Sequence, residues 1–175
     1  MKKIFIIAVI LLISPFYTSA SLDHNVSGWA WSENIGWISL NCTNFSCENS
    51  NYGVNINEDG TFSGYGWSEN VGWIDFAPAG PYPGLPDYSA RLDDVFVSGW
   101  IRALSYGGGW DGWIKTNGTN YGISVNPSSG DISGYAWSDF LIGWVSTSGT
   151  GYGAQTSFSF NSPPEGVDVV DMSVE

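Results

Sequence analysis

The segment SGWAWSENIGWISL at Ser27–Leu40 returns three more times along the chain, and this repetition decides the fold. The second copy is SGYGWSENVGWIDF at Ser63–Phe76, the third begins SGWIRALS at Ser98, and the fourth is SGYAWSDFLIGWVS at Ser133–Ser146. The leading glycines of successive copies are 36, 35 and 35 residues apart. A fixed period of this length is typical of tandem units that bury their hydrophobic faces against one another.

A second short element precedes most copies of the motif. It reads YGVNIN at Tyr52, YSARLD at Tyr88, YGISVN at Tyr121 and YGAQTS at Tyr152. Each unit therefore holds three short segments rich in β-branched and aromatic residues, with Asn, Pro, Gly and Ser at the turns between them. The pattern predicts an all-β protein of four three-stranded antiparallel units.

The two ends of the repeat region complement each other. The first unit lacks a Tyr segment before it, and the last Tyr segment, near Tyr152, has no motif after it. We therefore expect the C-terminal strand to complete the first unit and close a propeller-like ring, because closure removes exposed strand edges. A β-sandwich or an open β-solenoid made from the same units is the alternative.

The alternation inside the motif predicts two different strand faces. Trp29 and Trp31 share one face, while Gly28 and Ala30 share the other, where small residues let a second backbone approach closely. Large aromatic side chains are usually buried, so we assign the tryptophans that recur from unit to unit to core packing. These are Trp31, Trp37, Trp67, Trp73, Trp113, Trp137 and Trp144.

The N-terminal residues predict export. Residues 1–20 have a basic start, a ten-residue apolar run and small residues before a predicted cleavage site after Ala20, which is the plan of a signal peptide. The apolar run is too short to span a bilayer, and we expect no membrane span in the mature chain. The sequence predicts a secreted or cell-surface repeat domain at 21–161, followed by an acidic tail or linker at 162–175.

Charge and cysteine content limit the partners. After residue 20, three basic residues face 17 acidic ones, a net charge of −14 that repels nucleic acid. Cys42 and Cys47 are the only cysteines, and in an exported protein such a close pair predicts a disulfide. A single histidine and the absence of a calcium-loop motif predict no metal and no cofactor, so we read Asp93 and Asp94 as solvated turn acids.

The motifs resemble a family of uncharacterised secreted tandem-repeat proteins of uncultivated bacteria, recognisable by units of the GWAWSENIGWIS type. The third unit, with Trp100, Trp110 and Trp113, looks like the longer variant of that family's unit. The resemblance covers nearly all of the chain after the signal peptide. It implies export and a tandem architecture, and no activity or site comes with it.

The residue types favour binding over catalysis. Glu33, Glu69 and Asp139 stand at equivalent positions of three units, which indicates turn residues rather than a unique catalytic pair. We expect a non-catalytic surface-binding module whose partner is a glycan or a cell-surface protein; a structural spacer or surface-layer scaffold is one alternative, and a glycoside hydrolase a weaker one. Loops carry function, so the glycine-rich insertion of the third unit supplies the candidate ligand-binding residues. They are Trp100, Tyr106, Trp110 and Asp111.

Overall fold

Each copy of the repeat motif folds into a hairpin, whose first strand has seven or eight residues in the first, second and fourth copies and is interrupted at Gly99 in the third. The computed structural model describes residues 24–160, so the predicted signal peptide and the predicted tail at 162–175 lie outside the described residues. The described strands are β1 (Val26–Ser32), β2 (Gly36–Ser39), β3 (Val54–Ile56), β4 (Phe62–Ser68), β5 (Gly72–Asp75), β6 (Arg91–Asp93), β7 (Phe96–Ser98), β8 (Trp100–Ala103), β9 (Trp113–Lys115), β10 (Asn117–Gly118), β11 (Tyr121–Val125), β12 (Asp131–Ser138), β13 (Gly143–Ser146), β14 (Ser148–Gly149) and β15 (Tyr152–Thr156). One 3-10 turn, η1 (Cys42–Asn44), follows β2.

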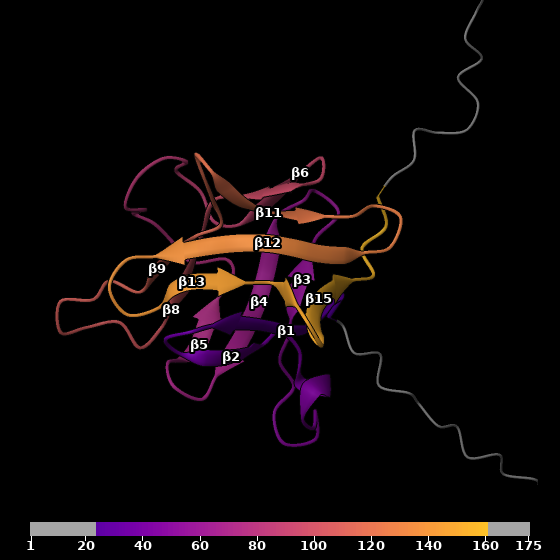
Figure 1. Ribbon diagram of the computed structural model, residues 1–175, viewed down its shortest axis with the longest axis horizontal. Helices are drawn as coiled ribbons and strands as arrows, with labels where there is room; N and C mark the ends of the chain where they lie inside the picture. The colour runs from indigo at the N-terminus through magenta and orange to yellow at the C-terminus, as the bar shows by residue number, and fades with distance from the viewer. Residues whose placement is uncertain (1–23, 161–175) are drawn as a thin grey trace, which may run out of the picture.

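Eight of these strands pair in a closed antiparallel barrel, and Figure 1 shows their arrangement. The two halves of each motif pair as a hairpin: β1 with β2, β4 with β5, β8 with β9 and β12 with β13. Neighbouring hairpins then pair with each other, β2 with β4, β5 with β8, β9 with β12 and β13 with β1. Every strand of this ring therefore has two neighbours.

The Tyr segments form a second ring of strands at the other end of the long strands. Strand β3 lies between β1 and β4, β11 lies between β7 and β12, and β6 pairs with β7 and reaches β4 through the Thr61–Arg91 bridge. The last strand, β15, pairs with both β12 and β1. The C-terminal strand thus joins the fourth unit to the first, where the sequence leaves the first unit without a Tyr segment.

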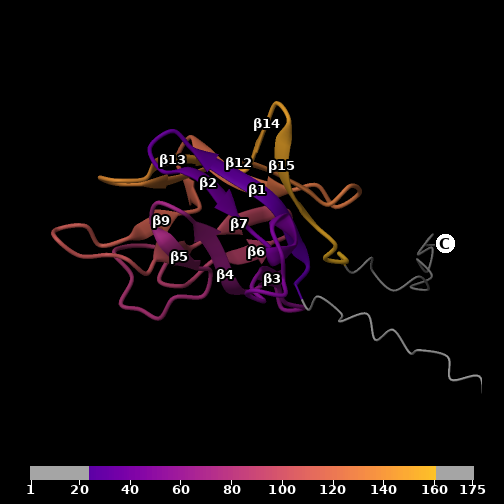
Figure 2. The same ribbon diagram turned by 90° about the horizontal axis from the view of Figure 1, so that it is seen from below.

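The all-β prediction is confirmed, but the units are not the separate blades of a propeller. In a propeller each blade keeps its own sheet, whereas here every hairpin hydrogen-bonds to the hairpin of the next unit. Figure 2 shows β12, β13 and β1 on one side of the barrel and β3, β4 and β5 on the other. Three strands make too small a sheet to cover itself, and a shared wall gives each strand its second neighbour.

Glycine lets each long strand pass from one ring to the other. Gly28, Gly64, Gly99 and Gly134 have φ values of 85°, 85°, 99° and 117°, a backbone region that side chains with a Cβ avoid. A Cβ at Gly28 would lie 2.1 Å from the carbonyl oxygen of Gly153 in β15, and the other three would meet a backbone carbonyl oxygen at 2.0 to 2.4 Å. The prediction that a second backbone approaches this face closely is confirmed.

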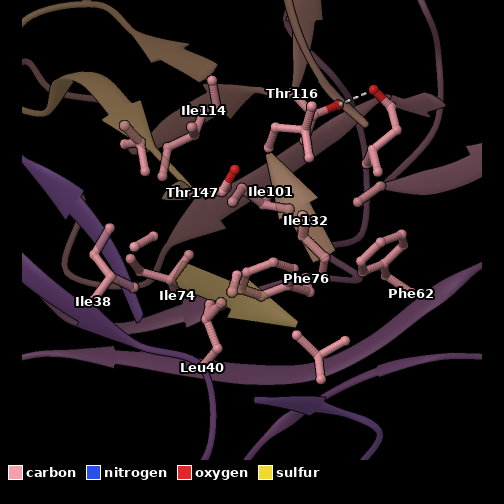
Figure 3. A pocket seen from close by; sticks show the side chains of 18 residues that line it. Ile38, Leu40, Phe62, Ile74, Phe76, Ile101, Ile114, Thr116, Ile132 and Thr147 are labelled. Atoms are coloured by element: carbon pink, nitrogen blue, oxygen red, sulfur yellow. Dashed lines mark hydrogen bonds between the residues drawn. The ribbon is translucent and has the colours of Figure 1, made fainter. Parts of the chain in front are cut away.

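Aliphatic side chains fill the barrel (Figure 3). Isoleucines from four different strands point toward one another around a cavity of about 50 Å³. The Thr116 hydroxyl at the cavity donates a hydrogen bond to the backbone carbonyl of Gly99, so this buried polar group has a partner. These isoleucines are Ile38 of β2, Ile74 of β5, Ile101 of β8 and Ile114 of β9.

The tryptophans lie on the outside of the wall, contrary to the prediction from sequence. Trp37 and Trp144 are 47% and 50% exposed, and of the seven tryptophans assigned to the core only Trp113 is buried. An eight-stranded barrel is just wide enough for side chains of moderate size, so its interior has no room for two indoles from every unit. Isoleucine, valine and alanine take the inner face, and the rings cover the outer one.

The hairpin turns close one end of the barrel. The Ser32 hydroxyl donates to the carbonyl oxygen of Ile142 at 2.7 Å, and Ser105 donates to that of Val71 at the same distance. Both acceptor residues are buried, and each bond joins the turns of neighbouring units. Side chains therefore continue the ring that the backbone forms.

Candidate functional site

Four equivalent rows of outward-facing side chains cross the outer wall of the barrel. The strand register places one residue from each of four neighbouring strands side by side, as in any antiparallel sheet. Each row takes its first two residues from one unit and its last two from the next, and we name it by its second residue. The Ser146 row is Tyr135, Ser146, Trp31 and Trp37; the Ser39 row is Trp29, Ser39, Trp67 and Trp73; the Asp75 row is Tyr65, Asp75, Arg102 and Trp113; the Lys115 row is Trp100, Lys115, Trp137 and Trp144.

Three rows end on an indole pair of nearly constant geometry. The ring centroids of Trp31 and Trp37 are 4.6 Å apart with an interplanar angle of 64°, and the pairs that end the Ser39 and Lys115 rows lie at 4.6 and 4.7 Å. A tyrosine from the Tyr strand meets the second indole edge to face; for Trp37 this is Tyr152 at 5.1 Å. Edge-to-face contacts favour this arrangement, so the rings form a fixed aromatic surface.

The Asp75 row replaces the first indole of the pair with Arg102. Its guanidinium carbon lies 3.6 Å from the ring centroid of Tyr106 and 4.5 Å from that of Trp113. Its Nε donates to the backbone carbonyl of Asp111 at 2.9 Å. The cation is therefore held between two rings, which stabilises this side of the wall by cation–π attraction.

The second residue of each row sits in a slot between its two neighbours in the register, both of which are aromatic in three of the four rows. The disulfide loop covers the slot of the Ser39 row. Cys42 and Cys47 form the predicted disulfide, with Cα atoms 4.8 Å apart. The Asn44 amide and the Tyr52 hydroxyl both donate to the Ser39 hydroxyl, at 2.9 and 2.8 Å, and Ser39 is fully buried. Burial raises the pKa of Tyr52 despite this hydrogen bond, so the phenol stays a donor.

Charged side chains take the same position in two other rows. Asp75 stands between Tyr65 and Arg102 in the register, and its carboxylate accepts a hydrogen bond from the backbone N–H of Ala77 at 2.8 Å. In the Lys115 row, the Lys115 ammonium lies 5.3 Å from the ring centroid of Trp100. The long lysine stem therefore lies against an aromatic wall of its own row.

The slot of the Ser146 row opens into an aromatic groove. The groove is about 600 Å³ in volume, within the range of small-molecule sites, and lies at the seam between the fourth unit and the first. Its aromatic lining consists of Trp31, Tyr135, Trp137, Trp144 and Tyr152. Glu33 and Asn34 from the β1–β2 turn also line it.

A repeat-equivalent groove lies one unit further round the wall and is half as large. It is about 290 Å³ in volume and is lined by Trp31, Trp67, Glu69 and Asn70, among others. The ring of Phe45, carried by the disulfide loop, also lines this groove and lies 5.3 Å from the ring of Trp29. The loop insertion after β2 thus narrows a groove that the seam leaves wide.

The residues predicted from sequence gather around the third unit, and the polar groups of Trp100 and Asp111 are hydrogen-bonded inside the protein. The Trp100 indole N–H donates to the backbone carbonyl of Pro86 at 2.9 Å, and the Asp111 carboxylate accepts from the backbone N–H of Trp113 at 3.2 Å. Tyr106 is half exposed, and its ring stacks on Arg102 of the Asp75 row. Trp110 packs partly buried against the core, and its indole N–H is buried with no partner among the described residues.

The groove residues were missed because they come from opposite ends of the sequence. Trp31 and Trp144 are far apart in the chain and become neighbours only when β13 pairs with β1. The closing strand predicted for the C-terminus is the one sequence feature that could have located this seam. Only the tertiary structure then determines which face of each strand points outward.

The described residues 24–160 contain no group of three or more His, Cys, Asp or Glu side chains placed to hold a metal ion. Asp93, considered for calcium, pairs with Arg91 at 3.0 Å, and Asp59 accepts hydrogen bonds from Thr61. Within the same part of the chain, no helix is long and apolar enough to cross a membrane. The described wall thus carries hydroxyls, amides, single carboxylates and the two cations Arg102 and Lys115 beside aromatic rings.

Comparison with known protein families, curated proteins and solved structures found no match to this chain.

Proposed function

We propose that this protein is an exported, non-catalytic binding module that binds glycans on its aromatic outer wall. The observation that carries the proposal is the half exposure of Trp37 and Trp144, together with the 600 Å³ groove beside the latter. A soluble protein of this size gains by burying such rings, and exposed aromatic surface of this kind indicates an interaction site.

Sugar chemistry fits a wall of this composition. The C–H faces of a pyranose ring are apolar and slightly positive, so they pack on the electron-rich face of an indole. Sugar hydroxyls need a few hydrogen-bonding groups nearby. Glu33 and Asn34 line the groove and supply a carboxylate and an amide for such hydrogen bonds. The net charge of −12 disfavours polyanions, which leaves neutral glycans as the preferred class.

The arrangement of acids supports binding without hydrolysis. Glycoside hydrolysis uses two carboxyl groups on opposite sides of the scissile bond. Of the described residues that line the seam groove, Glu33 alone is acidic. Its counterpart Glu69 lines the equivalent groove of the next unit, so this carboxylate follows the repeat instead of marking one reaction centre.

A structural role is the second candidate, favoured by the closed wall. Both rings of strands are continuous, serine side chains join the turns, and a disulfide closes part of the loop between β2 and β3. Such a ring has no free edge for aggregation or for proteolytic entry. A spacer of this kind would bind no glycan, so one set of binding measurements separates the two candidates.

The test is a glycan array followed by affinity electrophoresis of the full mature chain in gels that contain neutral polysaccharide. We expect retardation in at least one neutral polysaccharide, and its loss in the double variant Trp37→Ala, Trp144→Ala. Phe140→Ala is the matched control, because this aromatic ring is 89% exposed but belongs to none of the four rows. Binding by no glycan, or equal loss in the control, would contradict the proposal.

A further inference from the structure

We infer that the wall has one principal binding site, the slot above Ser146, and that it accepts a single neutral sugar ring. This inference rests on the proposed function and adds the location, the number of sites and the ligand class. It starts from the fourfold equivalence of the rows, which makes four slots comparable residue by residue.

Three of the four slots are filled by the protein itself. Ser39 lies under Asn44 and Tyr52 of the loop region, and both side chains donate hydrogen bonds to its hydroxyl oxygen. The other two slots hold the side chains of Asp75 and Lys115 where the seam has a serine. Each of these residues therefore occupies space in which an external ring would have to lie.

The slot of the Ser146 row has no loop over it, and Tyr152, the counterpart of Tyr52, lines the groove with its ring edge to face on Trp37 and makes no hydrogen bond to Ser146. The connection from β13 to β15 is short, since β14 begins two residues after Ser146, and it carries no counterpart of the disulfide loop. The serine hydroxyl donates to the backbone carbonyl of Ser148 at 2.7 Å and keeps its lone pairs for an incoming hydroxyl group. Tyr135 and Trp31 flank the serine in the register, and the groove surrounds all three.

The rim of this slot offers unused hydrogen-bonding groups. In the equivalent turn of the second unit, the Asn70 amide donates to the backbone carbonyl of Ile35 at 3.0 Å. The Asn34 amide lies over Gly143, 2.8 Å from where a Cβ on that glycine would be, and has no hydrogen-bond partner within residues 24–160. An amide and a carboxylate at one edge of an aromatic slot match the vicinal hydroxyl groups of a sugar.

The acidic side chains near this groove favour an uncharged ligand. Glu33 lines the groove, and the Asp139 carboxylate accepts from the Trp137 indole N–H at 2.9 Å nearby in the fourth unit. A uronate or sulfated sugar would bring a like charge to this rim, which disfavours binding. A neutral hexose or N-acetylhexosamine ring keeps its hydroxyls and brings no charge.

The decisive variant copies a filler that the protein already uses. Ser146→Lys places in the open slot the residue that fills the equivalent slot at Lys115, so the barrel should accept it. The matched control is Lys115→Ser, which changes the sister slot in the opposite direction. Binding of neutral hexose oligosaccharides, chitin oligosaccharides and oligogalacturonate to the full mature chain is measured by calorimetry, with near-ultraviolet circular dichroism as the check of folding.

We expect Ser146→Lys to weaken binding of the neutral or N-acetylated ligand by about tenfold or more, equivalent to one lost stacking contact, with Lys115→Ser close to wild type. Oligogalacturonate should bind more weakly than the neutral ligand. If Ser146→Lys fails to fold, Tyr135→Ala removes one wall of the slot, and Asn34→Ala at the exposed rim removes the free amide.

The outcomes separate the two levels of the argument. A wild-type protein that binds neither these ligands nor any glycan on the array overturns the proposed function and the site together. Binding to a different array glycan alone overturns the ligand class and leaves the proposed function standing. A wild-type protein that binds, with Ser146→Lys unchanged or Lys115→Ser equally impaired, overturns the site and leaves the proposed function standing. Stronger binding of oligogalacturonate overturns the assignment of a neutral ligand.

Discussion

Replacing Gly28 by alanine tests the way in which the barrel closes. Gly28 has a φ of 85° in β1, and a Cβ there would lie 2.1 Å from the carbonyl oxygen of Gly153 in the last strand. Left-handed backbone costs a residue with a Cβ about 1–2 kcal/mol. Forcing a methyl group into filled space costs about 1–3 kcal/mol more, so we expect Gly28→Ala to lower the free energy of unfolding by about 2–5 kcal/mol.

The other glycine of this contact is the control. A Cβ on Gly153 would have no heavy atom within 4 Å, and its backbone is not left-handed. Alanine is favoured over glycine inside a strand by about 0.5–1 kcal/mol, so Gly153→Ala should be neutral or slightly stabilising. Equilibrium denaturation followed by tryptophan fluorescence measures both variants, because the many indoles on the wall report its integrity.

A small difference in stability between Gly28→Ala and Gly153→Ala would contradict the described closure of the barrel. A domain of this kind is stable by about 5–15 kcal/mol, so the expected loss at Gly28 is a large fraction of the total. If Gly28→Ala and Gly153→Ala differ by less than about 0.5 kcal/mol, the size of an ordinary surface substitution, the strands do not cross at this glycine as described.

Three further predictions concern the core, the disulfide loop and acid stability. Ile74→Ala should cost about 2–5 kcal/mol in denaturant titrations and more than Trp144→Ala, because the isoleucine is fully buried and the larger indole is half exposed. Reducing the disulfide should cost about 2 kcal/mol by the loop-entropy estimate, measured by denaturation with and without reductant; no change would show that the loop holds its shape without the bond. Hydrogen bonds from Ser129 and then Gln155 lower the pKa of Asp131, so its contribution to stability is complete above the ordinary aspartate pKa of about 3.9 and is lost as the pH falls through its lower folded value. Ser129→Ala should raise that pKa in a carboxyl-carbon NMR titration, and an unchanged titration would refute the assigned cause.

Local pattern was sufficient for the elements of this protein. The alternation through Trp29, Ala30 and Trp31 marks a strand, and Gly28 marks the point where another backbone comes close. The spacing of the cysteines indicated their disulfide, and the unmatched Tyr segment at Tyr152 indicated a closing strand. These features depend on backbone geometry and on contacts within a unit, which each unit's own residues encode.

Which face of each strand points into the barrel depends on closure of the whole ring of strands. Trp31 and Ala30 both lie in an apolar strand, and nothing within one unit says which of them faces the core. That choice follows from closure, because eight strands enclose a space that aliphatic side chains fill and indoles do not. The groove at the seam has the same origin: Trp31 and Trp144 line it together only because the last hairpin pairs with the first strand. The sequence by itself determined the strands and their repetition, and the tertiary structure alone decided that the aromatic rings form an outer surface with one open slot.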